Sequence, residues 1–266
     1  MKSDNNKRYL IRFKNTYQSV LWGGGTIIVL LLLWEYAGTS GLVNPLFSSS
    51  PSRIVKTGWA LIQDGSLIKH IKSSAKIFIS GYLLSVAVGV PIGIALGWFK
   101  RARMAAGPLI AALYTTPRLA LMPLFIIWFG LGFGSRLALV MLSGVFYLII
   151  NMQTAIANLD PDLTRVSVSY GANRWQMFIT VAMPQSIPFL MTALRLASGR
   201  ALVGMVGAEV FGGNEGLGYL IQYAGATFQT DKVFVCVFVL AAFGITLDKL
   251  LLAISSKFNS WRGSGS

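Results

Sequence analysis

Three ionisable residues inside long apolar stretches, Arg118, Arg195 and Glu209, are the chain's candidates for polar chemistry. A charged side chain within a membrane-spanning segment is costly and by default marks a functional site. Arg118 follows Pro117 near the middle of 106–129, a stretch that prolines interrupt three times. Broken helix at membrane depth persists only where protein or a water-filled cavity satisfies its backbone groups. The sequence therefore predicts that Pro117 and Arg118 line a path, with a packed charge bonded to carbonyls as the open alternative.

Arg195 and Glu209 share a helix face but cannot pair with each other. The rise of 1.5 Å per residue separates them by about 21 Å along the fifth apolar stretch, so each needs a partner elsewhere. Arg195 either lines the path or extends to the cytoplasmic lipid headgroups. Glu209 opens the glycine-rich run EVFGGNEGLGYLI, which predicts a flexible outer turn. It is a candidate path residue, a gate or a partner contact, or simply the end of a helix.

Several kinds of chemistry are excluded by composition. One Cys and one His provide no thiolate or imidazole cluster for a metal, and no Gly-x-x-x-x-Gly-Lys-Ser/Thr loop exists to bind ATP. The nine carboxylates are scattered; only Asp160 and Asp162 lie close together, as helix-start residues do. The sequence thus predicts no catalytic site, no cofactor and no enzyme. Basic residues sit at the ends of apolar runs, which indicates membrane lipid and not nucleic acid as their partner.

The elements that position these residues are membrane-spanning helices. Hydrophobic residues make up 54% of the 266-residue chain and charged residues only 12%. A bilayer-crossing helix needs about 20 mostly apolar residues. Six stretches qualify and predict an all-α, polytopic membrane protein: 20–38, 75–98, 106–129, 136–157, 187–210 and 233–255.

The distribution of Lys and Arg predicts that both termini are cytoplasmic. One face of the predicted bundle receives twelve: Lys2, Lys7, Arg8, Arg12, Lys14, Lys100, Arg101, Arg103, Arg165, Arg174, Lys257 and Arg262. The other face receives six: Arg53, Lys56, Lys69, Lys72, Arg136 and Lys232. We divide the chain into a basic segment 1–19, a six-helix domain 20–257, and a tail 258–266 whose final Gly-Ser-Gly-Ser resembles a cloning linker.

A polar break between the fourth and fifth spans, residues 160–184, predicts a short helical hairpin. Asp160 is suited to cap a helix that begins at Pro161 and ends before Gly171. Asn173 is suited to cap a second helix, with Gln176 at the capping-box position, that runs to Pro184. Leu163, Val166 and Tyr170 share one face of the first helix, as expected of a surface that docks onto a soluble partner.

Small residues recur every fourth position along the second span, at Gly81, Ser85, Gly89, Gly93 and Gly97, and more briefly along the fifth, at Gly204, Ala208 and Gly212. Such stripes let helix backbones approach closely. Packing within one chain is the favoured interpretation, and a subunit interface is the alternative. In the first outer loop, a helix beginning near Ser52 is expected to lie on the membrane.

The hairpin and its surroundings resemble a known family. Gly171, nine residues, Val181, one residue and Met183-Pro184 are similar to the cytoplasmic motif of ABC importer permeases, written Glu-Ala-Ala, three residues, Gly, nine residues, Ile, one residue, Leu-Pro. The runs SSSPSRIV, PLFIIWFGLG, ALRLASGRA and AEVFGGNEGLGYLI resemble the nitrate, sulfonate and taurine subgroup of the binding-protein-dependent transport inner membrane components. One departure stands out: Arg165, Val166 and Ser167 occupy the Glu-Ala-Ala positions. If the family's glutamate makes a polar contact with the ATPase, that contact must here be rebuilt or reversed in charge.

The resemblance implies a type I ABC importer permease in a bacterial inner membrane. Its partners would be a second permease, usually an identical copy, two cytoplasmic ATPase subunits, and a periplasmic or lipid-anchored solute-binding protein. The solute would be a small anion such as nitrate, a sulfonate or taurine, and Arg118 would suit a transient anion site. The implied contacts with the ATPase are Leu163, Arg165, Val166, Ser167, Tyr170, Gly171, Trp175 and Pro184.

A self-contained secondary carrier for a small anion is the competing interpretation. It predicts internal symmetry, with broken helices in matching positions of the two halves. The proline-broken third span has no counterpart in the sixth span. Neighbouring genes for an ATPase and a secreted binding protein would favour the importer.

Overall fold

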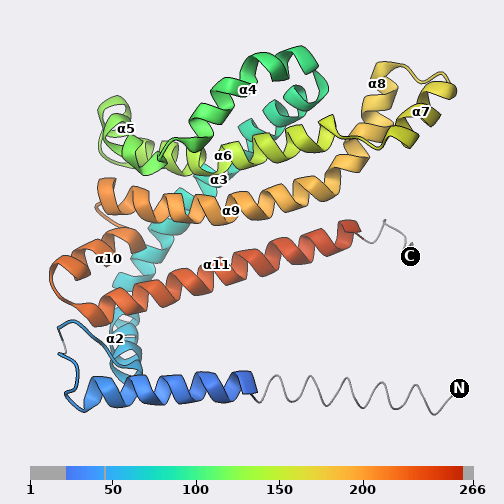
Figure 1. Cartoon of the computed structure of the whole chain (residues 1–266). Helices are drawn as coiled ribbons and strands as arrows, with labels where there is room; N and C mark the ends of the chain where they lie inside the picture. The colour runs from blue at the N-terminus through green and yellow to red at the C-terminus, as the bar shows by residue number, and fades with distance from the viewer. Residues whose placement is uncertain (1–21, 45, 260–266) are drawn as a thin grey trace, which may run out of the picture.

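A computed structural model describes residues 22–44 and 46–259, and these residues form helices joined by short turns (Figure 1). Residues 22–39 are helical. The following elements are α2 (Pro51–Gln63), α3 (Ser66–Trp98), α4 (Lys100–Thr115), η1 (Arg118–Leu121), α5 (Met122–Phe129), α6 (Phe133–Ala157), α7 (Pro161–Ser169), α8 (Arg174–Met177), η2 (Phe178–Ala182), α9 (Met183–Gly212), α10 (Leu217–Ala226) and α11 (Thr230–Asn259). The all-α prediction is confirmed.

Four helices in the described residues are long and apolar enough to cross a membrane: Ser66–Trp98, Phe133–Ala157, Arg174–Gly212 and Thr230–Ser256. The pair α4 and η1–α5 makes a fifth if it counts as one span. The predicted first span begins outside the described residues and continues in the helix at 22–39. The basic segment 1–19 and residues 260–266 of the predicted tail also lie outside them.

Two predicted loops contain more helix than expected. The second span begins at Ser66 and not near 75, and the predicted loop 211–232 contains α10. The expected outer helix is α2, which starts at Pro51 because the Ser50 hydroxyl accepts a hydrogen bond from Arg53 N–H. Its apolar residues divide between a buried side, including Ile54, and an exposed side, as a helix lying along a membrane surface requires.

The third span is broken once, at Thr116-Pro117, and the two parts meet at 91°. Pro108 lies within α4, and Pro123 lies in the first turn of α5, where a missing N–H is tolerated. The predicted interruption is therefore confirmed, but only one of the three prolines produces it. Arg118 is the first residue after the bend.

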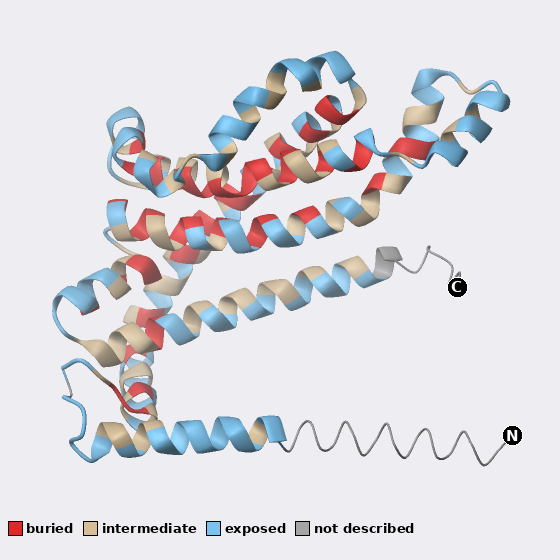
Figure 2. Ribbon diagram, viewed as in Figure 1, coloured by how far each residue is buried: buried red, intermediate tan, exposed pale blue. Residues whose placement is uncertain are grey.

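The core lies where α3, α6 and α9 pack together, and Figure 2 shows buried residues concentrated along these helices. The small-residue stripe of α3 faces α6 along its length. A Cβ added at Gly93 would lie 2.7 Å from the Ile149 carbonyl oxygen, and one at Gly97 would lie 2.5 Å from Ile156 Cβ. Small residues thus allow contact between backbones, and the predicted packing within one chain is confirmed.

Gly93→Ala is expected to destabilise the protein by about 1–3 kcal/mol, because backbone atoms of α6 must shift to admit the methyl group. Gly107→Ala is the matched control: this glycine also lies within a helix, but nothing comes within 4 Å of an added Cβ. The control should be neutral or up to about 1 kcal/mol stabilising. Thermal unfolding of the detergent-purified variants measures both; equal melting temperatures would contradict the close α3–α6 contact.

The helix that begins at Arg174 does not end at Pro184, contrary to the sequence prediction. It continues through the π-helical turn η2 into α9 and reaches Gly212. Proline lacks an N–H and clashes with the carbonyl four residues earlier. The wider turn just before it, in which Met183 N–H donates to the Phe178 carbonyl, accommodates that defect without ending the helix. The second helix of the hairpin and the fifth span therefore form one continuous helix.

Candidate coupling and translocation sites

The hairpin of α7 and α8 projects from the end of the bundle opposite α10 (Figure 1). Its shape follows from local capping: the Asp160 carboxylate accepts from Asp162 N–H at 2.9 Å. Asn173 and Gln176 form the expected capping box, with both hydrogen bonds at 2.9 Å. Between the two helices, Gly171 has φ +76°, a conformation that only glycine adopts readily.

The hairpin presents apolar side chains that the described residues leave uncovered (Figure 2). Leu163 is 49% exposed, Tyr170 89% and Trp175 67%, and Val166 is exposed beside them. Uncovered aromatic and aliphatic side chains of this kind mark an interaction surface. The prediction that Leu163, Val166 and Tyr170 form a docking face stays a prediction, because other residues of α7, such as Val168, are also exposed.

Arg165, at the position of the motif's glutamate, is exposed on α7 and lies 3.6 Å from the Asp162 carboxylate. Such a surface ion pair contributes little to stability, so the guanidinium remains available to another partner. Ser167 instead donates to the Leu163 carbonyl within the helix. The contact roles of Arg165, Ser167 and Pro184 stay predictions.

The hairpin is attached to the bundle by aromatic contacts. Trp175 stacks on Phe178, with ring centroids 5.5 Å apart, and Phe178 meets the edge of Trp98 at the end of α3 at 5.0 Å. The Gln185 side chain accepts a hydrogen bond from Asp160 N–H. These contacts connect the hairpin to α3 and α9.

Arg118 lies in a cluster of cations and tyrosines built from three parts of the chain. Its guanidinium carbon is 5.5 Å from the Tyr114 ring centre and 5.6 Å from that of Tyr147 on α6. The guanidinium of Arg200 on α9 lies 5.1 Å from the same Tyr147 ring. An arginine at the centre of a bilayer costs about 2.5–3.5 kcal/mol, whereas a cation–π contact contributes about 0.5–2 kcal/mol. Arg118 makes two of these contacts, which together are of the same order as that cost.

Arg118 also donates to the Tyr114 carbonyl at 3.1 Å, which agrees with the alternative of a charge bonded to carbonyls. Its Nε, however, is buried and has no partner among the described residues. Sequence reasoning did not include Arg200 and Tyr147 in this site. The position of Arg200 within an apolar run was the available signal.

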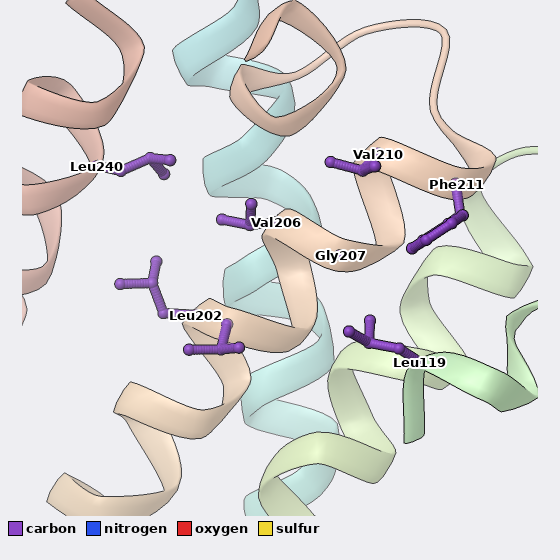
Figure 3. A pocket seen from close by; sticks show the side chains of 8 residues that line it. Leu119, Leu202, Val206, Gly207, Val210, Phe211 and Leu240 are labelled. Atoms are coloured by element: carbon purple, nitrogen blue, oxygen red, sulfur yellow. The ribbon is translucent and has the colours of Figure 1, made fainter. Parts of the chain in front are cut away.

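An apolar cavity of about 440 Å³ lies beside the bend, between η1, α9 and α11 (Figure 3). It is lined by Leu119, Leu202, Val203, Val206, Gly207, Val210, Phe211 and Leu240. Leu119 directly follows Arg118, and Val203 lies one turn beyond Arg200. All the residues that line this cavity are apolar or glycine.

Arg195 pairs with a residue that sequence reasoning missed. Its guanidinium donates twice to the Asp248 carboxylate on α11, once from Nη2 at 2.9 Å and once from Nε. The pair is about half exposed and joins α9 to α11 within the spans. The partner expected elsewhere for Arg195 is thus provided by another helix of the same chain, and a role for Arg195 in the path stays a prediction.

Glu209 is 0% exposed and caps the N-terminus of α10. Its carboxylate accepts from Gly218 N–H at 2.8 Å and from the Ser74 hydroxyl on α3. Ser74 accepts from Leu217 N–H, and His70 Nδ1 accepts from Gly216 N–H. Three amides that begin the helix are therefore satisfied by α3 and α9. The glycine-rich run is a packed junction, not a flexible turn, and Ser74 and His70 are members that the sequence did not reveal.

The fold and these features define a multi-pass membrane protein with a broken span inside its bundle and an apolar hairpin outside it. The chain belongs to the family described as binding-protein-dependent transport system inner membrane component, which matches residues 89–260. It is an inner-membrane permease subunit of an ABC importer. This result confirms the sequence resemblance and disfavours the secondary carrier.

Relatives of known name support the subgroup. The putative aliphatic sulfonates transport permease protein SsuC of Bacillus subtilis is 33% identical over 91% of this chain and 89% of its own length. The taurine transport system permease protein TauC of Escherichia coli is 30% identical over 90% and 89%, respectively. A chain from inward-facing structures of the MetNI methionine ABC transporter shares the fold, with a TM-score of 0.65 at 14% identity, covering 72% of this chain and 95% of that one.

Proposed function

We propose that this chain forms, together with a second copy, the translocation path of an importer that ATP hydrolysis on separate subunits drives. The observation that carries the proposal is the uncovered apolar face of α7, with Leu163, Val166 and Tyr170 on a rigid hairpin. A membrane bundle that needs no soluble partner has no reason to hold these side chains in water. A groove on the ATPase covers them in the assembled transporter.

Movement of the ATPase reaches the membrane through the hairpin. Because α8, η2 and α9 form one helix, a rotation of the docked hairpin tilts α9 within the bundle. Gly204 of α9 faces Ser143 of α6, and this contact between small residues lets α9 shift against α6. Two such packings provide the inward- and outward-facing states.

The hairpin and both termini lie on the cytoplasmic side, as the Lys and Arg distribution predicts. The α10 end then faces outward, where a solute-binding protein docks. The solute is a small anion, and the names of the sulfonate and taurine relatives support an organic sulfonate. Arg118 provides a positive charge beside the path.

Reconstitution tests this function. The chain is combined in liposomes with its cognate ATPase and solute-binding protein, with ATP on the hairpin side and ethanesulfonate on the other. We expect uptake that requires both partners and stops when the ATPase's phosphate-loop lysine is replaced. Uptake by the chain alone, driven by an ion gradient, would contradict the proposal.

A further inference from the structure

Two arginines share one tyrosine in the membrane-spanning part of the chain without a counter-ion. Arg118 and Arg200 both lie on the Tyr147 ring, at 5.6 and 5.1 Å. The ion pairs of the described residues are Arg53–Asp231, Lys69–Glu215, Arg165–Asp162 and Arg195–Asp248, and neither arginine is among them. Both guanidiniums lie within about 6 Å of the same ring centre, and an anion bound there would attract both positive charges.

Some N–H donors of these two arginines also have no hydrogen-bond acceptor within the described ranges. Arg118 Nη2 donates to the Tyr114 carbonyl, but its buried Nε has no acceptor in the described part of the chain. Buried donors are almost always bonded, so an unbonded one indicates a missing partner. Arg200 is exposed and lies one helical turn before Val203, which lines the cavity. A guanidinium presents a planar set of donors that matches the oxygen atoms of an oxyanion.

We propose that Arg118 and Arg200 together bind the oxyanion group of the solute, with Tyr147 holding the two guanidiniums in place. This inference rests on the proposed function and adds a solute site within the permease itself. The adjacent cavity wall is apolar, so the charged group of the solute binds at the arginines. A sulfonate has three oxygens around one sulfur, so it has enough hydrogen-bond acceptors for both guanidinium groups.

The site is divided between two parts of the chain that can move separately. Arg200 belongs to α9, the helix continuous with the hairpin, whereas Arg118 belongs to η1 beyond the bend. A tilt of α9 therefore changes the separation of the two guanidiniums. The two arginines bind the anion in one of the inward- and outward-facing states and release it in the other.

Titration of the purified permease with ethanesulfonate tests the site directly, against sodium chloride at equal ionic strength and without the binding protein. We expect saturable binding that raises the melting temperature, and roughly tenfold weaker binding for Arg118→Gln and for Arg200→Gln. The double variant should bind more weakly than either single variant, because each arginine donates to the same ligand. Arg101→Gln, an exposed arginine at the start of α4, is the control and should bind like the wild type.

Wild-type affinity in both glutamine variants would overturn the inference, as would absence of saturable binding in the wild type. These outcomes are separable from a failure of the proposed function. The titration needs no ATPase, whereas the proposed function fails if the ATPase does not copurify or uptake does not require ATP.

Discussion

The double variant Leu163→Asp, Tyr170→Asp should insert into the membrane normally and lose its ATPase. Both side chains are exposed, so the bundle does not need them. In the complex they are buried anchors, and truncation of an interface anchor commonly costs at least about 2 kcal/mol. Placing two carboxylates in an apolar groove adds a desolvation cost. We expect affinity to fall by about 10³-fold or more, which abolishes copurification and uptake.

Val168→Asp is the matched control. Val168 is an exposed apolar residue of the same helix, about 140° around the axis from Leu163. It should retain the ATPase and transport, because it faces away from the docking surface. Pull-down of the tagged permease, with membrane insertion checked by fractionation, measures both variants. Retained ATPase binding in the double variant would remove the docking hypothesis, and loss in both would mean that the docking face is wrongly assigned.

Glu209→Ala should be among the most destabilising substitutions in the bundle, at roughly 3–5 kcal/mol. The change leaves Gly218 N–H without its acceptor and takes a partner from the Ser74 hydroxyl, and both groups are buried. It also leaves a cavity beside Gly216, whose added Cβ would lie 2.3 Å from the Glu209 carboxyl carbon. The α10 end of the bundle should loosen, which thermal unfolding and hydrogen exchange of the α10 amides would detect.

Two further variants distinguish the loss of the hydrogen bonds to Glu209 from the loss of a negative charge in general. Glu209→Gln keeps the shape and one acceptor oxygen, so it should cost only about 1 kcal/mol. Glu215→Ala removes a nearby carboxylate that lies 3.8 Å from Lys69 at the surface, and it should change stability by less than about 1 kcal/mol. A melting temperature of Glu209→Ala equal to that of Glu215→Ala would show that the cap contributes nothing.

The best predicted features are those whose causes lie within a few residues. The caps at Asp160 and Asn173 and the turn at Gly171 are local, because each hydrogen bond spans at most four residues. The stripe of small residues on α3 could also be predicted from the sequence, because residues four positions apart lie on the same face of a helix. Pro184 was misjudged because a proline ends a helix unless the preceding turn widens, and that depends on packing around it.

Composition and local pattern alone thus determined that the chain is a helical membrane protein and that a capped hairpin interrupts its apolar segments, but not the exact bounds of the spans. Only the tertiary structure decided which charges meet. Arg195 pairs with Asp248, 53 positions away, and Glu209 with Ser74, 135 positions away. The Arg200–Tyr147 contact likewise joins two separate helices. The physical reason is that such pairs depend on how packed helices are rotated and offset along their axes. Side chains from several helices determine that arrangement together, so it cannot be read from any one segment.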